Sequence, residues 1–372
     1  MQDRVSLYPG RVKLEPVAGQ ANTYDLTRAD QPTQEGTPLN TASLLKDATA
    51  ALLGLSTDAV PDDAFVALVL GQGVYGYRVR VQLADGTPVE GATVSGIQPL
   101  TGSTLVTGAD GTVLGKSASA SVTIGCTSPY IDQKAPAAQT VTKTGTITDV
   151  TLTLESITDM LTISSSKTAK ISSMVKTLDV FASGGGGGGC GGINAGGGGG
   201  YASNKLNVPI SGNADLKITI GAGGNGGTSS SLNGGNGGDT TVSLNNVTTL
   251  TASGGLGGTT TTAGAGNGPG GSKGADGSAA SVPVFNDSSI GIKTGGGGGG
   301  GNANFGVRNY GGAPNGGYGG YVLHGTSADH PYGGGNGGIG GGGGGGTDFY
   351  ATYAGGNGGP GIVYLRFHFD AA

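Results

Sequence analysis

Charged residues and cysteine are scarce in this sequence. Lys, Arg, Asp and Glu make up 12% of its 372 residues, and the formal net charge is −5. Because a nucleic-acid-binding protein needs a basic patch or stripe, we expect no nucleic-acid partner. The two cysteines, Cys126 and Cys190, lie in regions of different composition. They cannot make a disulfide framework, so we expect two independent thiols and assembly in a reducing cytoplasm.

Long apolar stretches are also missing. The chain contains no run of about 18 apolar residues, the length that a membrane-spanning helix needs, so we expect no membrane insertion. Its first ten residues, MQDRVSLYPG, have no basic segment followed by an apolar stretch. Because a secretory signal peptide has both, we expect synthesis in the cytoplasm without export by the Sec route.

Side chains suited to catalysis are few in the second half of the chain. All four glutamates precede residue 184, and there are only three histidines. A glycosidase needs paired carboxylates, and a serine or cysteine nucleophile needs a nearby base. Patterns of the form G-x-G-x-x-G arise here from composition, since none follows a strand and opens a helix. We therefore expect no enzymatic activity, no catalytic residues and no cofactor.

One group of potential metal ligands stands close together in the sequence. His324, Asp329 and His330 fall within a loop-like segment. Their spacing matches no familiar ligand motif, which favours polar surface residues. We expect no metal site.

Glycine is what the sequence has in excess. It has 83 glycines, of which 16 precede residue 184 and 67 lie within residues 184–361. Collagen needs glycine at every third position, whereas here glycines form unbroken runs and G-G-x repeats, so a collagen helix is excluded. Strand-like segments at residues 217–220 and 362–365 interrupt the glycines, which disfavours a flexible linker.

Residues 1–72 have the most ordinary composition. Apolar residues recur at helical spacing over residues 42–52, with Thr41 or Asn40 as a possible cap and Gly54 as the end. A second short helix is predicted within residues 56–70. Neither helix can bury a core alone, so we interpret residues 1–72 as a small helical adaptor that packs on itself, on sister chains or on another protein.

Residues 73–157 change to the alternating pattern of β-strands. Alternation is clearest over residues 77–83, and Asp85-Gly86 and Asp110-Gly111 are turn signals. The spacing predicts a small β-sandwich. The sequence V-x-V-x-L-x-D-G-x-P-V-x-G-A-x-V, at residues 79–94, resembles carboxypeptidase-regulatory-like and related immunoglobulin-like spacer domains. Residues 158–183 are a Ser/Thr-rich connector that ends in a strand.

The glycine-rich part, residues 184–372, needs an unusual source of stability. Glycine loses about 1 kcal/mol more backbone entropy than alanine on folding. Without side chains, however, helices of the polyproline II type can approach closely and form lateral hydrogen bonds. The overall fold class expected is therefore mainly β, with a helical adaptor, a β-sandwich spacer, and a domain of strands and polyglycine-II-like helices.

Three segments carry a family resemblance. FASGGGGGGCGG at residues 181–192, LKITIGAGGNGG at residues 216–227 and GGNGGPGIVYLRF at residues 355–367 resemble the glycine-rich ends of phage tail fibres, including the fibre-tip adhesins of some T-even-type phages. PGRVKLEPV at residues 9–17 and TASLLKDATAALLGL at residues 41–55 resemble the start of tail fibres from phages and prophages of Gram-positive bacteria.

The resemblance implies a virion protein. Its N-terminal region would attach to tail or baseplate proteins, and its glycine-rich domain would recognise a bacterial surface glycan or protein. Such fibres are generally trimers, so a homotrimer is expected. A purely structural fibre or baseplate accessory, and the equivalent fibre of a phage-derived bacteriocin, remain open alternatives.

Aromatic residues mark the candidate site. Eight of the 20 aromatic residues fall within residues 301–353. Tyrosine-rich loops on a rigid scaffold offer large amphipathic surfaces with little entropy to lose, but the same rings could pack over glycine helices or between subunits. The candidate receptor-binding residues are Phe305, Arg308, Tyr310, Tyr318, Tyr321, His324, His330, Tyr332, Phe349, Tyr350 and Tyr353.

Overall fold

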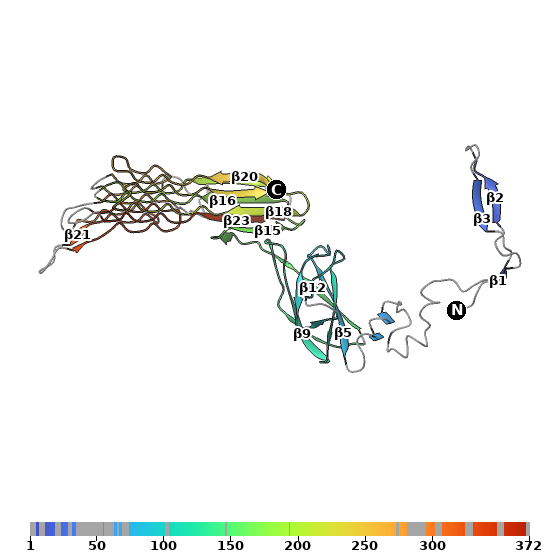
Figure 1. The fold of residues 1–372 in the computed structure, drawn as a ribbon. Coiled ribbons are helices and arrows are strands. Elements are labelled where there is room, and N and C mark those ends of the chain that lie inside the picture. Colours follow the sequence, from blue (N-terminus) through green and yellow to red (C-terminus); the bar gives the residue numbers. More distant parts are fainter. Residues whose placement is uncertain are drawn as a thin grey trace. The chain divides into compact units, whose positions relative to one another are not determined.

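The chain divides into two compact units. The first comprises Met1–Thr127 and Ala135–Thr153, and the second comprises Ser128–Lys134 and Leu154–Ala372 (Figure 1). The computed structural model describes residues 5–6, 12–18, 24–28, 32–34, 55, 63–64, 67–68, 74–100, 104–145, 147–192, 194–272, 275–280, 295–301, 307–323, 330–347 and 353–369.

The described N-terminal residues are mainly strands. β1 (Val5–Ser6) pairs with β4 (Pro32–Gln34), and β2 (Val12–Pro16) pairs with β3 (Tyr24–Arg28), both antiparallel. Helical backbone occurs among the described residues only at residues 63–64 and 67–68. The expected helix over residues 42–52 lies outside the described residues. The structure therefore does not show the helical adaptor that periodicity predicted.

Residues 75–127 and 135–153 form two sheets of the first unit. One has the strand order β12-β5-β8-β7, with β12 parallel to β5, and the other has the order β11-β9-β6. Their bounds are β5 Tyr75–Gln82, β6 Thr93–Ser95, β7 Gln98–Pro99, β8 Thr112–Ser117, β9 Ser121–Thr127, β11 Gln139–Thr142 and β12 Ile147–Thr153.

Alternation of side chains explains these strands. Tyr77, Val79 and Val81 of β5 are fully buried, while Arg78 and Arg80 between them are not. The period of two puts the apolar set on one face of the sheet. Both predicted turns are present, and each needs glycine because the backbone enters the left-handed region, with φ of 86° at Gly86 and 74° at Gly111.

The second unit contains two four-stranded antiparallel sheets. Their strand orders are β14-β23-β16-β17 and β15-β18-β19-β20. The bounds are β14 Leu161–Ile163, β15 Lys167–Ile171, β16 Thr177–Ser183, β17 Ala202–Pro209, β18 Ala214–Thr219, β19 Thr240–Leu244, β20 Val247–Ala252 and β23 Ile362–His368. A short pair, β10 (Gln133–Lys134) with β13 (Glu155–Ser156), also belongs to this unit.

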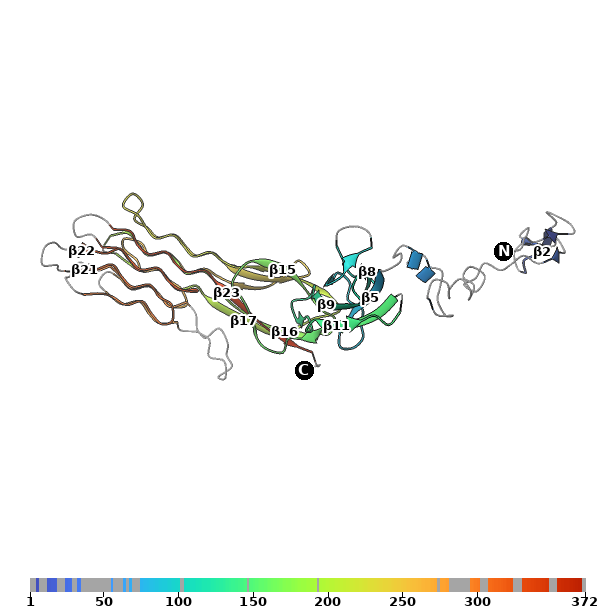
Figure 2. The same ribbon diagram turned by 90° about the horizontal axis from the view of Figure 1, so that it is seen from below.

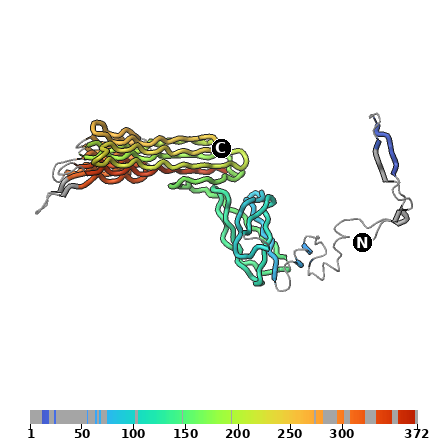
Figure 3. The backbone as a smooth tube through the Cα atoms, in the orientation of Figure 1, coloured from blue at the N-terminus to red at the C-terminus, as the bar shows by residue number. Residues whose placement is uncertain are grey.

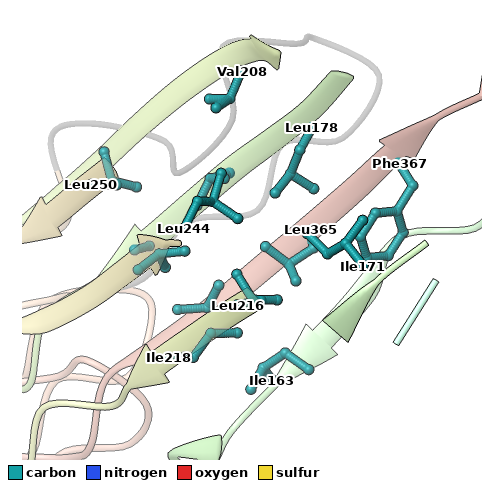
Figure 4. Close-up of a cluster of buried hydrophobic side chains, with 14 of the residues drawn as sticks. Ile163, Ile171, Leu178, Val208, Leu216, Ile218, Leu244, Leu250, Leu365 and Phe367 are labelled. Carbon is teal, nitrogen blue, oxygen red and sulfur yellow. The ribbon is translucent and has the colours of Figure 1, made fainter. Parts of the chain in front are cut away.

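Side chains from both sheets form one apolar core. Leu178 of β16 and Leu365 of β23 meet Leu216 of β18 and Leu244 of β19 between the two sheets (Figure 4). Leu178, Leu216 and Leu365 are at most 1% exposed. The two sheets thus close into a sandwich held by ordinary side-chain packing.

Beyond this sandwich the strands continue into glycine-rich runs. β16 leads into residues 184–192, and the last run, residues 353–361, leads into β23. The runs lie side by side along one direction (Figures 2 and 3). We call these glycine-rich runs, which lie between residues 184 and 361 outside the sandwich strands, the glycine bundle.

Backbone hydrogen bonds connect the runs with a repeat of three residues. Successive N–H groups from Gly184 to Gly192 donate in rotation to residues 195–201, 232–238 and 353–359, over 2.7–3.1 Å. Carbonyls from Gly185 to Cys190 accept in rotation from three further runs, residues 221–227, 253–258 and 340–346. Residues 184–192 are buried throughout and have their backbone groups paired.

Close approach leaves no room for a side chain at Gly184 to Gly189 of the inner run, although Cys190 of the same run is buried. A Cβ atom on Gly186 would lie 2.0 Å from the carbonyl oxygen of Gly341, and one on Gly188 would lie 2.0 Å from that of Asn225. Backbone atoms cannot rotate away as a side chain can. Unbroken glycine runs are therefore the interior elements.

Outer runs have the G-G-x pattern because every third residue faces solvent. Ala222 and Asn225 are exposed, as are Ala354, Asn357 and Pro360, whereas the glycines between them are buried or half-buried. Asparagine has a further use at these positions. Asn357 Oδ1 accepts a hydrogen bond from the Gly226 N–H over 2.7 Å, so its side chain joins two outer runs.

Candidate binding surface

A short hairpin brings two of the predicted tyrosines together. β21 (Val322–Leu323) pairs with β22 (His330–Pro331) at the end of the glycine bundle remote from the sandwich (Figure 2). The Tyr332 N–H donates to the Tyr321 carbonyl over 2.9 Å. The two rings stack with centroids 5.1 Å apart and planes inclined by 14°, a contact that contributes about 0.5–1.5 kcal/mol beyond burial.

An arginine from a neighbouring run covers a third tyrosine. The Arg308 guanidinium carbon lies 3.6 Å from the centroid of the Tyr318 ring and 5.3 Å from that of Tyr321. A Cβ atom on Gly335 would lie 2.6 Å from Tyr318 ring atoms, so the ring rests against a glycine. We call Arg308, Tyr318, Tyr321 and Tyr332 the tyrosine–arginine cluster.

The repeat of three residues sets which way these side chains face. In the sequence N-G-G-Y-G-G-Y, at residues 315–321, Asn315 and Tyr318 are exposed and Tyr321 is half-buried, while the glycines between them are buried or half-buried. Tyr318 is 40% exposed and Tyr332 is 44% exposed. The cluster therefore presents aromatic and cationic groups to solvent from the outer surface of the bundle.

Tyr310 is the most exposed of the candidate tyrosines, at 66%. Its backbone N–H donates to Asp276 Oδ1 over 2.6 Å. The neighbouring Asn309 is buried, and its amide donates to the Gly300 carbonyl over 2.6 Å. Hydrogen bonds on the adjoining residue and on its own backbone thus hold Tyr310 while most of its surface stays exposed.

The structure describes the remaining candidate residues only in part. Tyr353 is half-buried, and its carbonyl accepts from the Gly192 N–H over 3.0 Å. His330 lies in β22, and its side chain lies outside the described residues. Four candidates lie wholly outside the described residues, namely Phe305, His324, Phe349 and Tyr350.

Two aromatic residues outside the predicted site are buried on the strands. Phe181, Ile362 and Tyr364 form a second buried cluster on the strands β16 and β23. Burial raises the pKa of the Tyr364 hydroxyl. Neither ring belongs to the predicted site.

The described residues hold no group of three or more His, Cys, Asp or Glu side chains placed to bind a metal ion. Asp329 and His324, two of the three possible ligands, are outside this part of the chain. Both cysteines are free, as the sequence predicted. Burial raises the pKa of the Cys190 thiol, and a weaker opposing contribution comes from Asn194.

Sequence reasoning missed Asp276 and Asn315 as supports of this surface. Asp276 holds the backbone of Tyr310, and the Asn315 amide donates to the Ile339 carbonyl over 3.0 Å. The register of the G-G-x repeat was a signal that could have identified Asn315, Tyr318 and Tyr321 as one outward-facing column. In the part of the chain that the structure describes, no helix has the length and apolar character to cross a membrane.

Comparison with known proteins gives one result. No curated protein matches the chain. The family model of the glycine-rich domain matches residues 162–368, more than half of the sequence. This range begins within β14 and ends with β23, so it spans the sandwich strands from β14 onward and the whole glycine bundle. The chain therefore belongs to the glycine-rich domain family.

Proposed function

We propose that the protein is a phage tail fibre that recognises the surface of a bacterial host with its glycine-rich domain. The observation that carries the proposal is the tyrosine–arginine cluster beside the β21–β22 hairpin, together with the exposed Tyr310. Rigid aromatic side chains supply contact area at little entropic cost, and arginine adds directed hydrogen bonds. The mechanism is binding, with no chemical step.

The bundle suits this role as a scaffold. We infer that its runs are polyglycine-II-type helices, because each returns to the same neighbour after three residues. A helix hydrogen-bonded on all sides resists bending, so side chains on outer runs are held in fixed positions. Loops between runs can then vary without altering the interior.

The other regions complete the fibre. In this proposal, residues 1–72 attach to tail or baseplate proteins, the two sheets of residues 75–153 are a β-sandwich spacer, and three copies of the chain assemble. The protein resides in the virion, or in the equivalent particle of a phage-derived bacteriocin. These parts rest on the resemblance to tail fibres and on the predicted organisation of the chain.

Substitution tests the proposal better than deletion does. Removing residues 302–353 would also remove residues 340–346, which are interior to the bundle. We therefore choose Tyr310→Ser combined with Tyr332→Ser, because both side chains are largely exposed. Purified wild-type chain should adhere to at least one strain in a panel of intact bacteria, and the double variant should lose most of that adhesion.

Tyr201→Ser is the matched control. Tyr201 is 41% exposed and lies just before β17, at the sandwich end of the bundle, so this variant should adhere as the wild type does. Full adhesion by the double variant would remove the assignment of this surface. If the wild-type chain adheres to no strain yet is required for particle assembly, a purely structural fibre or baseplate role is supported.

A further inference from the structure

We propose that Arg308 makes this surface selective for glycans that carry an oxyanion, either a carboxylate or a phosphate. The inference rests on the proposed function and adds the chemical class of the ligand. It starts from the composition of the region, where Arg308 is the only Lys or Arg within residues 295–361. Arg308 is thus the one lysine or arginine in a range that also holds the carboxylates of Asp329 and Asp348.

Arg308 is available to a ligand. Its side chain is exposed, and no carboxylate of the described residues forms an ion pair with it. Asp276 contacts the run that contains Arg308, but its carboxylate accepts a hydrogen bond from the Tyr310 N–H. Among the described residues no acceptor pairs with the five N–H donors of this guanidinium, so water satisfies them there, and an oxyanion can replace that water.

Tyr318 orients the guanidinium. At 3.6 Å from the ring centroid, the planar group is held against the aromatic face, which leaves its N–H edge for bonds in its own plane. Two parallel N–H donors match the two oxygens of a carboxylate or phosphate. Holding the group in advance also lowers the entropy lost on binding. Tyr318 is thus a positioning residue for Arg308.

Exposed rings flank this cation. Tyr332 stacks on Tyr321, and Tyr321 lies 5.3 Å from the Arg308 guanidinium carbon. Tyr310, two residues along the run from Arg308, is free of ring contacts among the described residues. The surface therefore offers one point for an anion beside faces suited to sugar rings. One arginine is too little for nucleic acid, which requires a series of basic contacts along its phosphates.

Binding of defined polymers to the full chain tests the proposal. The probes are poly(glycerol phosphate), polygalacturonate and, as the neutral comparison, dextran. We expect the wild-type chain to bind at least one acidic polymer and to bind dextran weakly or not at all. Arg308→Gln should weaken acidic-polymer binding about tenfold or more, the effect of losing a charge-assisted hydrogen bond.

Three further variants separate the causes. Lys217→Gln removes the same charge from an exposed position on β18 and should leave binding unchanged. Arg308→Lys keeps the charge without the planar fork and should bind less well than wild type but better than Arg308→Gln. Tyr318→Leu removes the platform without changing charge, and should weaken binding to acidic polymers. Raising the salt concentration should weaken wild-type binding more than that of Arg308→Gln.

Three outcomes would overturn the proposal: equal binding to dextran, undiminished binding by Arg308→Gln, or binding to neither acidic polymer. Bacterial adhesion by the same preparations is the separate readout for the proposed function. Suppose that Arg308→Gln still adheres to bacteria and that neither acidic polymer competes with this adhesion. The proposal of host recognition would then stand, and the proposal of an acidic ligand would be wrong. Binding to an acidic polymer without adhesion to any strain supports the role of Arg308 and counts against the tail-fibre assignment.

Discussion

The sandwich and the glycine bundle belong to the same unit and share continuous chain segments, yet different atoms hold them together. In the sandwich, side chains such as Leu216 and Leu365 fill the space between two sheets. In the bundle, backbone N–H and carbonyl groups of residues 184–192 bind six neighbouring runs. One core is apolar and tolerant of repacking. The other is polar, and its spacing leaves no room for even one added carbon.

This difference means that separate sets of residues in the bundle can provide stability and binding. Because the bundle interior is made of backbone, it requires almost nothing of the outward residues in the G-G-x repeats. Those positions are then free to carry tyrosine, as at Tyr318 and Tyr321, or asparagine, as at Asn225 and Asn357. A sandwich of the same size would need its alternate residues for the core.

The largest expected effect comes from adding one methyl group inside the bundle. In Gly188→Ala the new Cβ would lie 2.0 Å from the Asn225 carbonyl oxygen and 2.4 Å from its carbon. Since backbone on all sides blocks relief, we expect a loss of more than about 4 kcal/mol or failure to fold. Gly235→Ala is the control, because its Cβ would lie 3.2 Å from the backbone nitrogen of the same Asn225. It should cost about 1 kcal/mol or less.

Chemical denaturation and thiol alkylation measure this contrast. Burial raises the pKa of the Cys190 thiol, so less reactive thiolate is present at neutral pH when the bundle is closed. Alkylation of Cys190 should be faster in Gly188→Ala than in wild type or Gly235→Ala. If Gly188→Ala and Gly235→Ala are equally stable, the distance between the interior runs can increase to admit a methyl group. That result would contradict a core packed from backbone atoms.

A truncation in the sandwich core should have the next largest effect. Leu216 is 1% exposed and contacts side chains of both sheets. Leu216→Ala should lower the free energy of unfolding by about 2–5 kcal/mol, from lost burial and the cavity left behind. The exposed neighbour Lys217→Ala is the control and should change it by about 0.5 kcal/mol or less. Thermal unfolding followed by circular dichroism measures both, and a Leu216→Ala protein as stable as the control would contradict an apolar core here.

The smallest effect concerns the asparagine that joins outer runs. Asn357→Ala removes the acceptor of the Gly226 N–H, which water can replace at this exposed position. We expect a loss of about 0.5–1.5 kcal/mol. Asn233→Ala, at an exposed asparagine of another outer run, removes no side-chain hydrogen bond among the described residues and should be neutral. If Asn233→Ala lowers the free energy of unfolding more than Asn357→Ala does, then the backbone preference of asparagine explains its use here, and the hydrogen bond between runs does not.

Local pattern predicted much of the fold. The strands containing Tyr77, Val122 and Ile218 follow from alternation, and the turns at Gly86 and Gly111 from the Asp-Gly dipeptides. The N-terminal block is a separate case, because the helix expected over residues 42–52 lies outside the described residues and stays a prediction. Residues 63–64 and 67–68, within the second expected helix, have helical backbone. The pairing of β2 with β3 was not predicted, since strand pairing depends on residues distant in the chain.

The candidate site was predicted as a set of residue types and assembled only by the fold. Composition pointed to tyrosines and to Arg308 between residues 301 and 353, but gave no means of pairing them. Arg308 meets Tyr318 because their runs are neighbours, and Tyr321 meets Tyr332 because β21 and β22 pair. Both pairs depend on which backbone segments are hydrogen-bonded to each other. A sequence of glycines does not indicate which segments these are.

By itself, the sequence determined that residues 184–361 contain 67 glycines, and that these alternate between unbroken runs and G-G-x repeats. This is enough to predict contact between backbones in the bundle and a period of three. The tertiary structure decided which run lies inside, which six runs surround it, and which outward residues meet. The reason is physical: glycine carries no side chain to specify a partner, so partners are selected by where the strands and loops deliver each run.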